Sequence, residues 1–80
     1  MTNVTVQYFA VLREQAGRSE ERVATDAATA AALYAQLQTR HGLRVARTQL
    51  RVAINGEFAD WDAPLAEGAR VVFIPPVAGG

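Results

Sequence analysis

The end of the chain carries the residues with the clearest chemical potential. It reads Pro75-Pro76-Val77-Ala78-Gly79-Gly80. Proline has no backbone N–H and cannot extend a β-ladder, and two in succession favour a stiff, extended exit from a strand. The glycines have no Cβ and fit a channel too narrow for other residues. We therefore expect residues 75–80 to form a tail whose Gly80 carboxylate enters another protein's active site and is modified there.

A Gly-Gly ending also has a plainer explanation, because a frayed end or a remnant of cloning looks the same. The context favours the functional interpretation. The pair follows an apolar segment and the two prolines, with no linker between them.

The rest of the chain offers few groups for catalysis. It contains no cysteine, a single histidine, and eight basic residues that are all arginine, so it has no thiolate, no cysteine-ligated metal and no lysine amine. His41 precedes Gly42 at an expected helix end, which explains it better than metal binding does. Asp60 and Asp62 flank Trp61 in a connection that favours a turn. We expect no metal site and no permanently bound cofactor in this chain.

Composition narrows the range of partners. Eighty residues are enough for one small domain, and eight basic residues balance eight acidic ones. A nucleic-acid binder of this size usually carries a basic surplus, so nucleic acid is not expected. The sequence shows no secretory signal at its start and no apolar run as long as a membrane span. The expected setting is the cytoplasm, without a membrane partner.

The pattern of apolar residues predicts five strands to support this tail. Residues 4–9 and 50–54 alternate apolar and polar side chains, as half-buried strands do. Residues 20–24 predict a polar edge strand, and residues 57–59 a short return strand after the Asn55-Gly56 hairpin signal. Residues 71–74 are an apolar run that predicts a central strand buried on much of both faces. The residues expected to face the core are Val4, Val6, Tyr8, Leu50, Val52 and Ile54.

Two helical segments complete the expected scaffold. Residues 11–16 form a short helical turn that Gly17 ends, and Thr29 caps a longer helix over residues 30–40 that Gly42 ends. One main helix covers only one face of a sheet. The expected architecture is therefore α+β, a mixed five-stranded sheet packed against one main helix. It forms a domain over residues 1–74, followed by the tail over residues 75–80.

The whole chain resembles the small subunit of molybdopterin synthase, a sulfur carrier of the ubiquitin-like β-grasp family. The most specific likeness is the ending Phe-Ile-Pro-Pro-Val-Ala-Gly-Gly over residues 73–80. Ile74 in place of an aromatic residue, and Ala78, are mild departures from the family pattern. Two inner motifs match as well: Tyr8-Phe9-Ala10 followed by Arg13-Glu14 and Gly17, and residues 62–65 followed by Glu67-Gly68.

This resemblance implies a cycle of loading and unloading. A ubiquitin-activating-enzyme-like adenylyltransferase uses ATP and magnesium to adenylate Gly80, and sulfur from a persulfide donor then replaces AMP to leave a thiocarboxylate. The tail, residues 75–80, inserts into the large subunit of molybdopterin synthase and gives its sulfur to cyclic pyranopterin monophosphate, in molybdenum cofactor biosynthesis. The family implies a heterotetramer of two small and two large subunits. The catalytic side chains belong to the large subunit, so this chain carries sulfur without itself being the catalyst.

A docking surface is expected near the start of the tail. If Val4, Val6 and Tyr8 face the helix, alternation turns Phe9 to the opposite side. The resemblance places Phe58 and Ile74 on that same region, and exposed apolar clusters on small domains usually mark interfaces. We call Phe9, Phe58 and Ile74 the docking patch. The alternative is that Phe58 covers the hairpin and Ile74 belongs to the core.

Three other functions compete with this one. The activated Gly80 suits a ubiquitin-like modifier that is conjugated to lysines, and it suits a sulfur carrier for thiamine synthesis or tRNA thiolation. Thiamine-type carriers are usually shorter and lack the Pro-Pro exit, so the ending favours molybdopterin synthase. A β-grasp adaptor with an inert tail is the last alternative.

Overall fold

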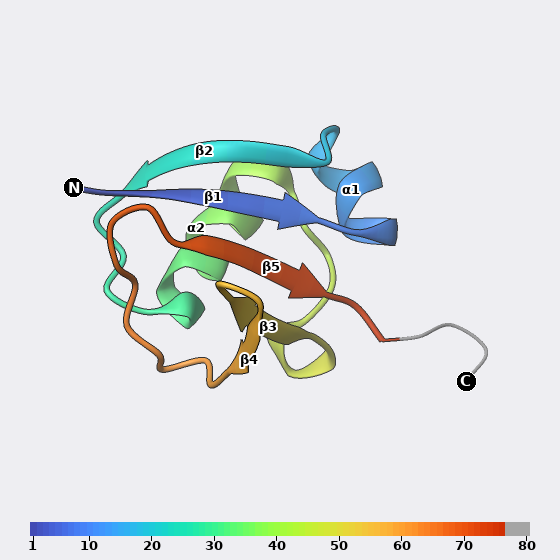
Figure 1. Ribbon diagram of the computed structural model, residues 1–80. Helices are drawn as coiled ribbons and strands as arrows, with labels where there is room; N and C mark the ends of the chain where they lie inside the picture. The colour runs from blue at the N-terminus through green and yellow to red at the C-terminus, as the bar shows by residue number, and fades with distance from the viewer. Residues whose placement is uncertain (77–80) are drawn as a thin grey trace.

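The computed structural model describes residues 1–76 (Figure 1). Five strands form a single sheet, with one long helix, one short helix and a 3-10 turn around it. No helix among these residues is long and apolar enough to cross a membrane. In chain order the elements are β1 (Thr2–Tyr8), α1 (Ala10–Ala16), β2 (Glu20–Thr25), α2 (Ala30–His41), η1 (Arg47–Gln49), β3 (Arg51–Ile54), β4 (Glu57–Ala59) and β5 (Arg70–Ile74).

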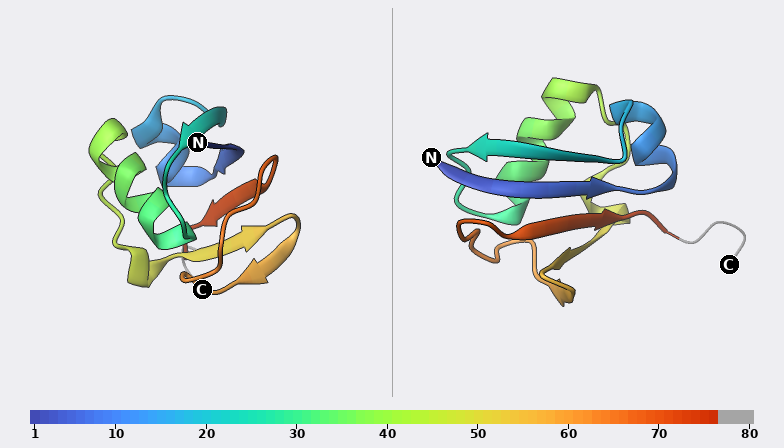
Figure 2. Two further views of the ribbon diagram at one scale, coloured as in Figure 1. Left: turned by 90° about the vertical axis from the view of Figure 1, so that its left-hand side faces the viewer. Right: turned by 45° about the horizontal axis from the view of Figure 1, so that its top comes forward.

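The sheet is mixed, with strand order β2-β1-β5-β3-β4. β1 and β5, the first and last strands, lie side by side and parallel, whereas β1–β2, β5–β3 and β3–β4 are antiparallel. Because β1 and β5 run the same way, both end at the same edge of the sheet, beside α1 (Figure 1). Figure 2 shows α2 packed across one face only. We call this the inner face and the opposite one the outer face.

α2 begins and ends where its flanking residues predict. The Thr29 hydroxyl accepts a hydrogen bond from the Ala32 N–H at 3.2 Å, which satisfies one of the free donors of the first turn. Gly42 ends the helix in the left-handed conformation with φ of 68°, which glycine adopts without strain. Its inward residues pack against the inner face of β1, β5 and β3. The buried side chains of this core include Val4, Val6, Tyr8, Leu33, Tyr34, Leu37, Val52, Val71 and Phe73.

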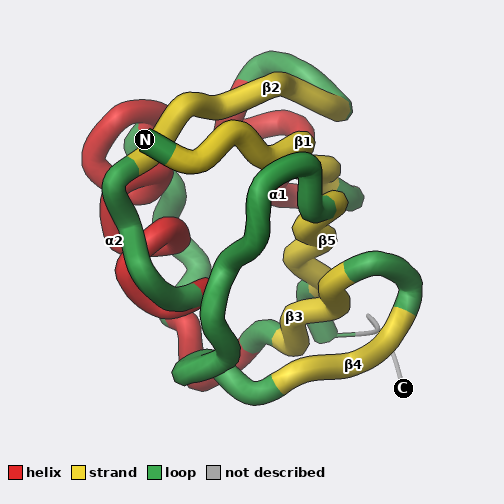
Figure 3. The backbone as a smooth tube through the Cα atoms, turned by 60° about the vertical axis from the view of Figure 1, so that its left-hand side comes forward, coloured by secondary structure: helices red, strands yellow, loops and turns green. Residues whose placement is uncertain are grey.

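The long connection between β4 and β5 fastens the start of α2 to the sheet (Figure 3). The N–H groups of Ala30 and Ala31, which lack partners inside the helix, donate to the carbonyls of Ala63 and Trp61 at 3.1 and 2.9 Å. The Trp61 ring stacks on Phe73 at a centroid distance of 5.9 Å and contacts Tyr34 at 5.8 Å. Trp61 is therefore a packing residue, and the carboxylates beside it occupy the exposed turn that was expected.

The expected architecture is confirmed. β5 is central, its inner-face residues Val71 and Phe73 are fully buried, and Val72 and Ile74 on the outer face are partly buried. The strand is therefore buried on much of both faces, as expected, and more completely on the face that α2 covers. Ile54 faces the core as expected but stays partly exposed, since it ends β3 next to the hairpin.

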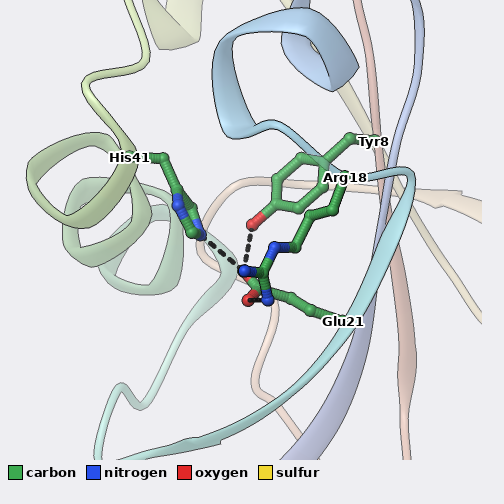
Figure 4. A network of polar contacts seen from close by, with 4 residues as sticks. All are labelled: Tyr8, Arg18, Glu21 and His41. Carbon is green, nitrogen blue, oxygen red and sulfur yellow. Dashed lines mark hydrogen bonds and ion pairs between the residues drawn. The ribbon is translucent and has the colours of Figure 1, made fainter.

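A polar network on the inner face ties the end of α2 to β1 and β2 (Figure 4). Glu21 Oε1 accepts hydrogen bonds from the Tyr8 hydroxyl at 2.6 Å and from His41 Nε2 at 2.7 Å, and Oε2 pairs with the Arg18 guanidinium at 3.2 Å. The Glu21 side chain is 7% exposed. His41 therefore lies at the helix end, as expected, and its partner is a buried carboxylate rather than the helix carbonyls alone.

The network shifts the pKa values of Glu21 and Tyr8. Burial works against ionisation of Glu21, but the hydrogen bonds from Tyr8 and His41 and the nearby positive charge of Arg18 outweigh it, so the pKa of Glu21 lies below its usual value. Burial, together with the bond to Glu21, raises the pKa of Tyr8 far above its usual value. A carboxyl group whose pKa is lower in the folded than in the unfolded state contributes its full stabilisation at pH values above the unfolded-state pKa. That contribution is lost as the pH falls through the folded-state pKa.

Replacing this carboxylate tests the network. We expect Glu21→Gln to lower the free energy of unfolding at neutral pH by about 1–3 kcal/mol, because Tyr8, His41 and Arg18 lose a charged acceptor. As the pH falls below 4.5, the ordinary glutamate pKa, the wild type loses the same contribution and the two proteins converge. Urea unfolding over a pH series measures both effects.

Glu20→Gln is the matched control. Glu20 is the neighbouring carboxylate on β2, but its side chain is 51% exposed and pairs with Arg70 on the outer face. Its removal is expected to change stability by less than about 1 kcal/mol. A Glu21→Gln deficit that is the same at every pH would show that ionisation of Glu21 contributes nothing.

Candidate docking face and tail

The tail begins at the sheet edge where β1 and β5 end. Ile74 pairs with Arg51 as the last register position of β5, and the chain then continues into Pro75, which is partly buried, and Pro76, which is exposed. The prolines provide no N–H for β1 or β3, so the ladder stops here. The remaining residues predicted for the tail, Val77, Ala78, Gly79 and Gly80, lie outside the described residues.

The three docking-patch residues are all accessible to some degree. Phe58 is 66% exposed and Phe9 is 42% exposed, and they are among the few large apolar side chains on the described surface. Ile74 is partly buried, since it lies on a central strand. The structure therefore does not support the alternative in which Ile74 belongs to the core.

Strand register places the patch on the outer face. Phe58 on β4 is opposite Ala53 on β3, and Ala53 is opposite Val72 on β5, so an apolar band crosses three strands. Ile74 lies two residues beyond Val72 on the same face. Tyr8 pairs with Phe73, so continuing the parallel register places Phe9 alongside Ile74. The sequence had not indicated Ala53 and Val72, which connect Phe58 to the other two.

The backbone holds Phe9 away from the core. Phe9 is extended, with φ of −122° and ψ of 152°, so it continues the alternation of β1 and caps α1. The next residue, Ala10, has a φ of 50°, in the left-handed region that a non-glycine residue rarely adopts. This sharp turn starts α1 directly after Phe9, which leaves Phe9 partly exposed at the corner of the sheet where β1 ends.

The site is a surface together with a tail. Residues 1–76 enclose no pocket, and they hold no group of three or more metal-ligating side chains. The polar cluster around Glu21 is on the inner face, at the end of α2 and away from the docking patch. What this arrangement offers is an exposed apolar outer face, with Pro75 and Pro76 at the adjacent sheet edge.

Comparison with known proteins identifies the family. Residues 6–80 match the model of the ThiS family. The chain is 36% identical over 80 residues to the molybdopterin synthase sulfur carrier subunit of Escherichia coli K12, and this match covers 96% of the chain and 99% of that protein.

Solved structures with the same fold agree. A putative molybdopterin converting factor subunit 1 from Pyrococcus furiosus has a TM-score of 0.80 and 30% identity, covering 96% of this chain and 100% of its own. SAMP1 from Haloferax volcanii, a small archaeal modifier protein, has a TM-score of 0.80 and 28% identity, covering 98% and 99%. A complex of subunits 1 and 2 of molybdopterin-converting factor from Helicobacter pylori contains a chain with a TM-score of 0.70 and 26% identity, covering 99% and 100%.

The expected fold and resemblance are thus confirmed. The chain belongs to the ThiS family, has the ubiquitin-like β-grasp fold, and over nearly its whole length is similar to the molybdopterin synthase sulfur carrier subunit.

Proposed function

We propose that this chain is the sulfur carrier subunit of molybdopterin synthase, with Gly80 as the carrier residue. The observation that carries the proposal is the 36% identity to the Escherichia coli subunit across nearly both full lengths. The Gly79-Gly80 ending after Pro75-Pro76 supplies the chemical handle. The complex of subunits 1 and 2 from Helicobacter pylori supports a large subunit as the partner.

The proposed chemistry starts from the inertness of a carboxylate. Adenylation by an activating enzyme joins the Gly80 carboxylate to the α-phosphate of ATP, with magnesium assisting and pyrophosphate leaving, which gives the acyl carbon a good leaving group. A persulfide sulfur displaces AMP, and a second thiol releases the thiocarboxylate by taking up the donor sulfur in a disulfide. The thiocarboxylate then transfers its sulfur to cyclic pyranopterin monophosphate within the large subunit.

This chain's own contribution is positioning. The prolines after Ile74 end the β5 ladder, and the outer face fixes the domain against the partner. Holding one reactant in place converts a bimolecular encounter into a local one, which favours transfer. No side chain of the described domain needs to act as acid, base or nucleophile in this scheme.

Conjugation to other proteins is the second candidate function. It is favoured by the similarity to SAMP1, a small archaeal modifier protein, at 28% identity. A modifier and a sulfur carrier both use the adenylated Gly80. They differ in the group that attacks it, which is a lysine amine for the modifier and a sulfur nucleophile for the sulfur carrier. Isopeptide-linked conjugates of this chain in cell lysate would support the modifier function.

Intact-mass measurement tests the loading step. After incubation with the activating enzyme, ATP, magnesium and a sulfur source, we expect the mass of the chain to rise by the difference between one sulfur and one oxygen atom. Omitting ATP is the control and should leave the mass unchanged. An unchanged mass with an enzyme that is active on another carrier would favour the inert adaptor.

Deleting Gly80 separates the tail from the domain. We expect the shortened protein to lose sulfur transfer entirely while its unfolding midpoint stays the same, because a single terminal residue contributes little to stability. Pterin conversion and thermal unfolding measure the two effects. Pterin conversion that persists in the deletion variant would contradict the tail mechanism.

Truncating Phe9 tests the docking patch. We expect Phe9→Ala to weaken binding to the large subunit by about 1–3 kcal/mol, as loss of a central aromatic anchor does. Arg40→Ala is the control, since Arg40 is exposed on α2, on the other side of the sheet. Calorimetric titration measures both affinities, and equal affinities for Phe9→Ala and the wild type would remove Phe9 from the patch.

A further inference from the structure

On the outer face, the strands carry more basic than acidic side chains. The charged side chains that strand alternation turns to this face are three arginines and one glutamate, although the full sequence has a net charge of +0. Arg70 on β5 pairs with Glu20 on β2 at 2.9 Å, so these two charges compensate each other. Arg22 on β2 and Arg51 on β3 form no ion pair within residues 1–76, although Arg22 lies within electrostatic reach of the Glu67 carboxylate.

Arg51 is the arginine that lies next to the apolar band. Its guanidinium carbon is 4.7 Å from the centre of the Phe58 ring, and its register partner on β5 is Ile74, the residue before the prolines. The residue is exposed. The ion pairs found within residues 1–76 involve Arg18, His41 and Arg70, and none of them involves Arg51.

Stacking on Phe58 prepares this guanidinium for a further contact. A planar guanidinium lying on an aromatic face is attracted to the ring and keeps its N–H edge free. That edge can donate two parallel hydrogen bonds to a carboxylate. Such charge-assisted hydrogen bonds are stronger than hydrogen bonds between uncharged groups. Because the side chain is already held, less conformational entropy is lost when the contact forms.

We propose that Arg51 is the charged specificity determinant of the outer face, and that it pairs with a carboxylate on the large subunit at the rim of the surface that receives Phe58 and Ile74. This inference rests on the proposed function. The partner chemistry follows from the face itself: an apolar band with an uncompensated guanidinium at its margin is complementary to an apolar surface with a carboxylate beside it. Arg51 contacts Phe58, so the charged and apolar contacts form one site.

The experiment compares Arg51→Gln with Arg22→Gln in binding to the cognate large subunit. The two substitutions remove the same charge from the same face, but Arg22 lies on the opposite edge strand, away from Phe58. We expect Arg51→Gln to raise the Kd about tenfold or more, as loss of a charge-assisted hydrogen bond does. Arg22→Gln, which affects only long-range attraction, should change the Kd less than about threefold.

The salt dependence of the Kd and the conservative variant Arg51→Lys provide two further measurements. The wild-type Kd should rise with ionic strength, and Arg51→Gln should show a flatter dependence because one ion pair is gone. Arg51→Lys keeps the charge but loses the planar stack, so its Kd should fall between those of the wild type and Arg51→Gln. Thermal unfolding of each variant confirms that the fold is intact, which the exposure of both arginines leads us to expect.

The outcomes separate this inference from the proposed function. If the wild type binds the large subunit and Arg51→Gln binds equally well, or no worse than Arg22→Gln, the role of Arg51 is overturned while the sulfur-carrier proposal stands. If the wild type does not bind the large subunit at all, the proposed function fails and this inference fails with it. A tenfold loss confined to Arg51→Gln supports both.

Discussion

The parallel pairing of β1 with β5 is the constraint on which the rest of the molecule depends. It joins the two ends of the chain at the centre of the sheet, so the residues after both strands emerge at the same edge. Phe9 after β1 and Ile74 at the end of β5 lie at this same edge for this reason, although they are far apart in sequence. A parallel pair requires a crossover, and α2 provides its packed core on one face only. The exposed outer face is a consequence of the same topology.

The two faces of the sheet therefore have different roles. The inner face holds the core, the aromatic contacts of Trp61 and the Glu21 network, which together fasten both ends of α2 to the strands. The outer face carries the apolar band and the arginines. Because alternate residues of each strand serve opposite faces, substitutions on the outer face need not disturb the packing beneath α2.

Local patterns were sufficient to predict most of the scaffold. The alternation in β1 and β3, the Thr29 cap, the terminating glycines and the Asn55-Gly56 turn are all decided by nearby residues, and each is found where it was expected. The apolar run in β5 predicted a central strand buried on much of both faces, but not which face would be the more completely buried, because composition alone does not reveal how many helices lie against a sheet. The tail residues beyond Pro76 remain a prediction from sequence and resemblance.

Sequence patterns could not predict contacts between residues that are far apart along the chain. Glu21 looked like one of several charges on a polar edge strand, and only the packing of α2 brings His41 to it across 20 positions. The contact of Arg51 with Phe58 similarly needs the pairing of β3 with β4 to be known in register. Such groups were overlooked because their chemistry depends on neighbours that the folded topology supplies.

The placement of Trp61 has a practical consequence for the study of this protein. It is the single tryptophan of the chain, and it stacks on Phe73 beside Tyr34, between β5 and α2. Its intrinsic fluorescence is thus a built-in optical reporter of whether helix and sheet remain together. Since the indole lies on the side of the sheet opposite to Phe58, the fluorescence reports the integrity of the domain without a dye on the outer face.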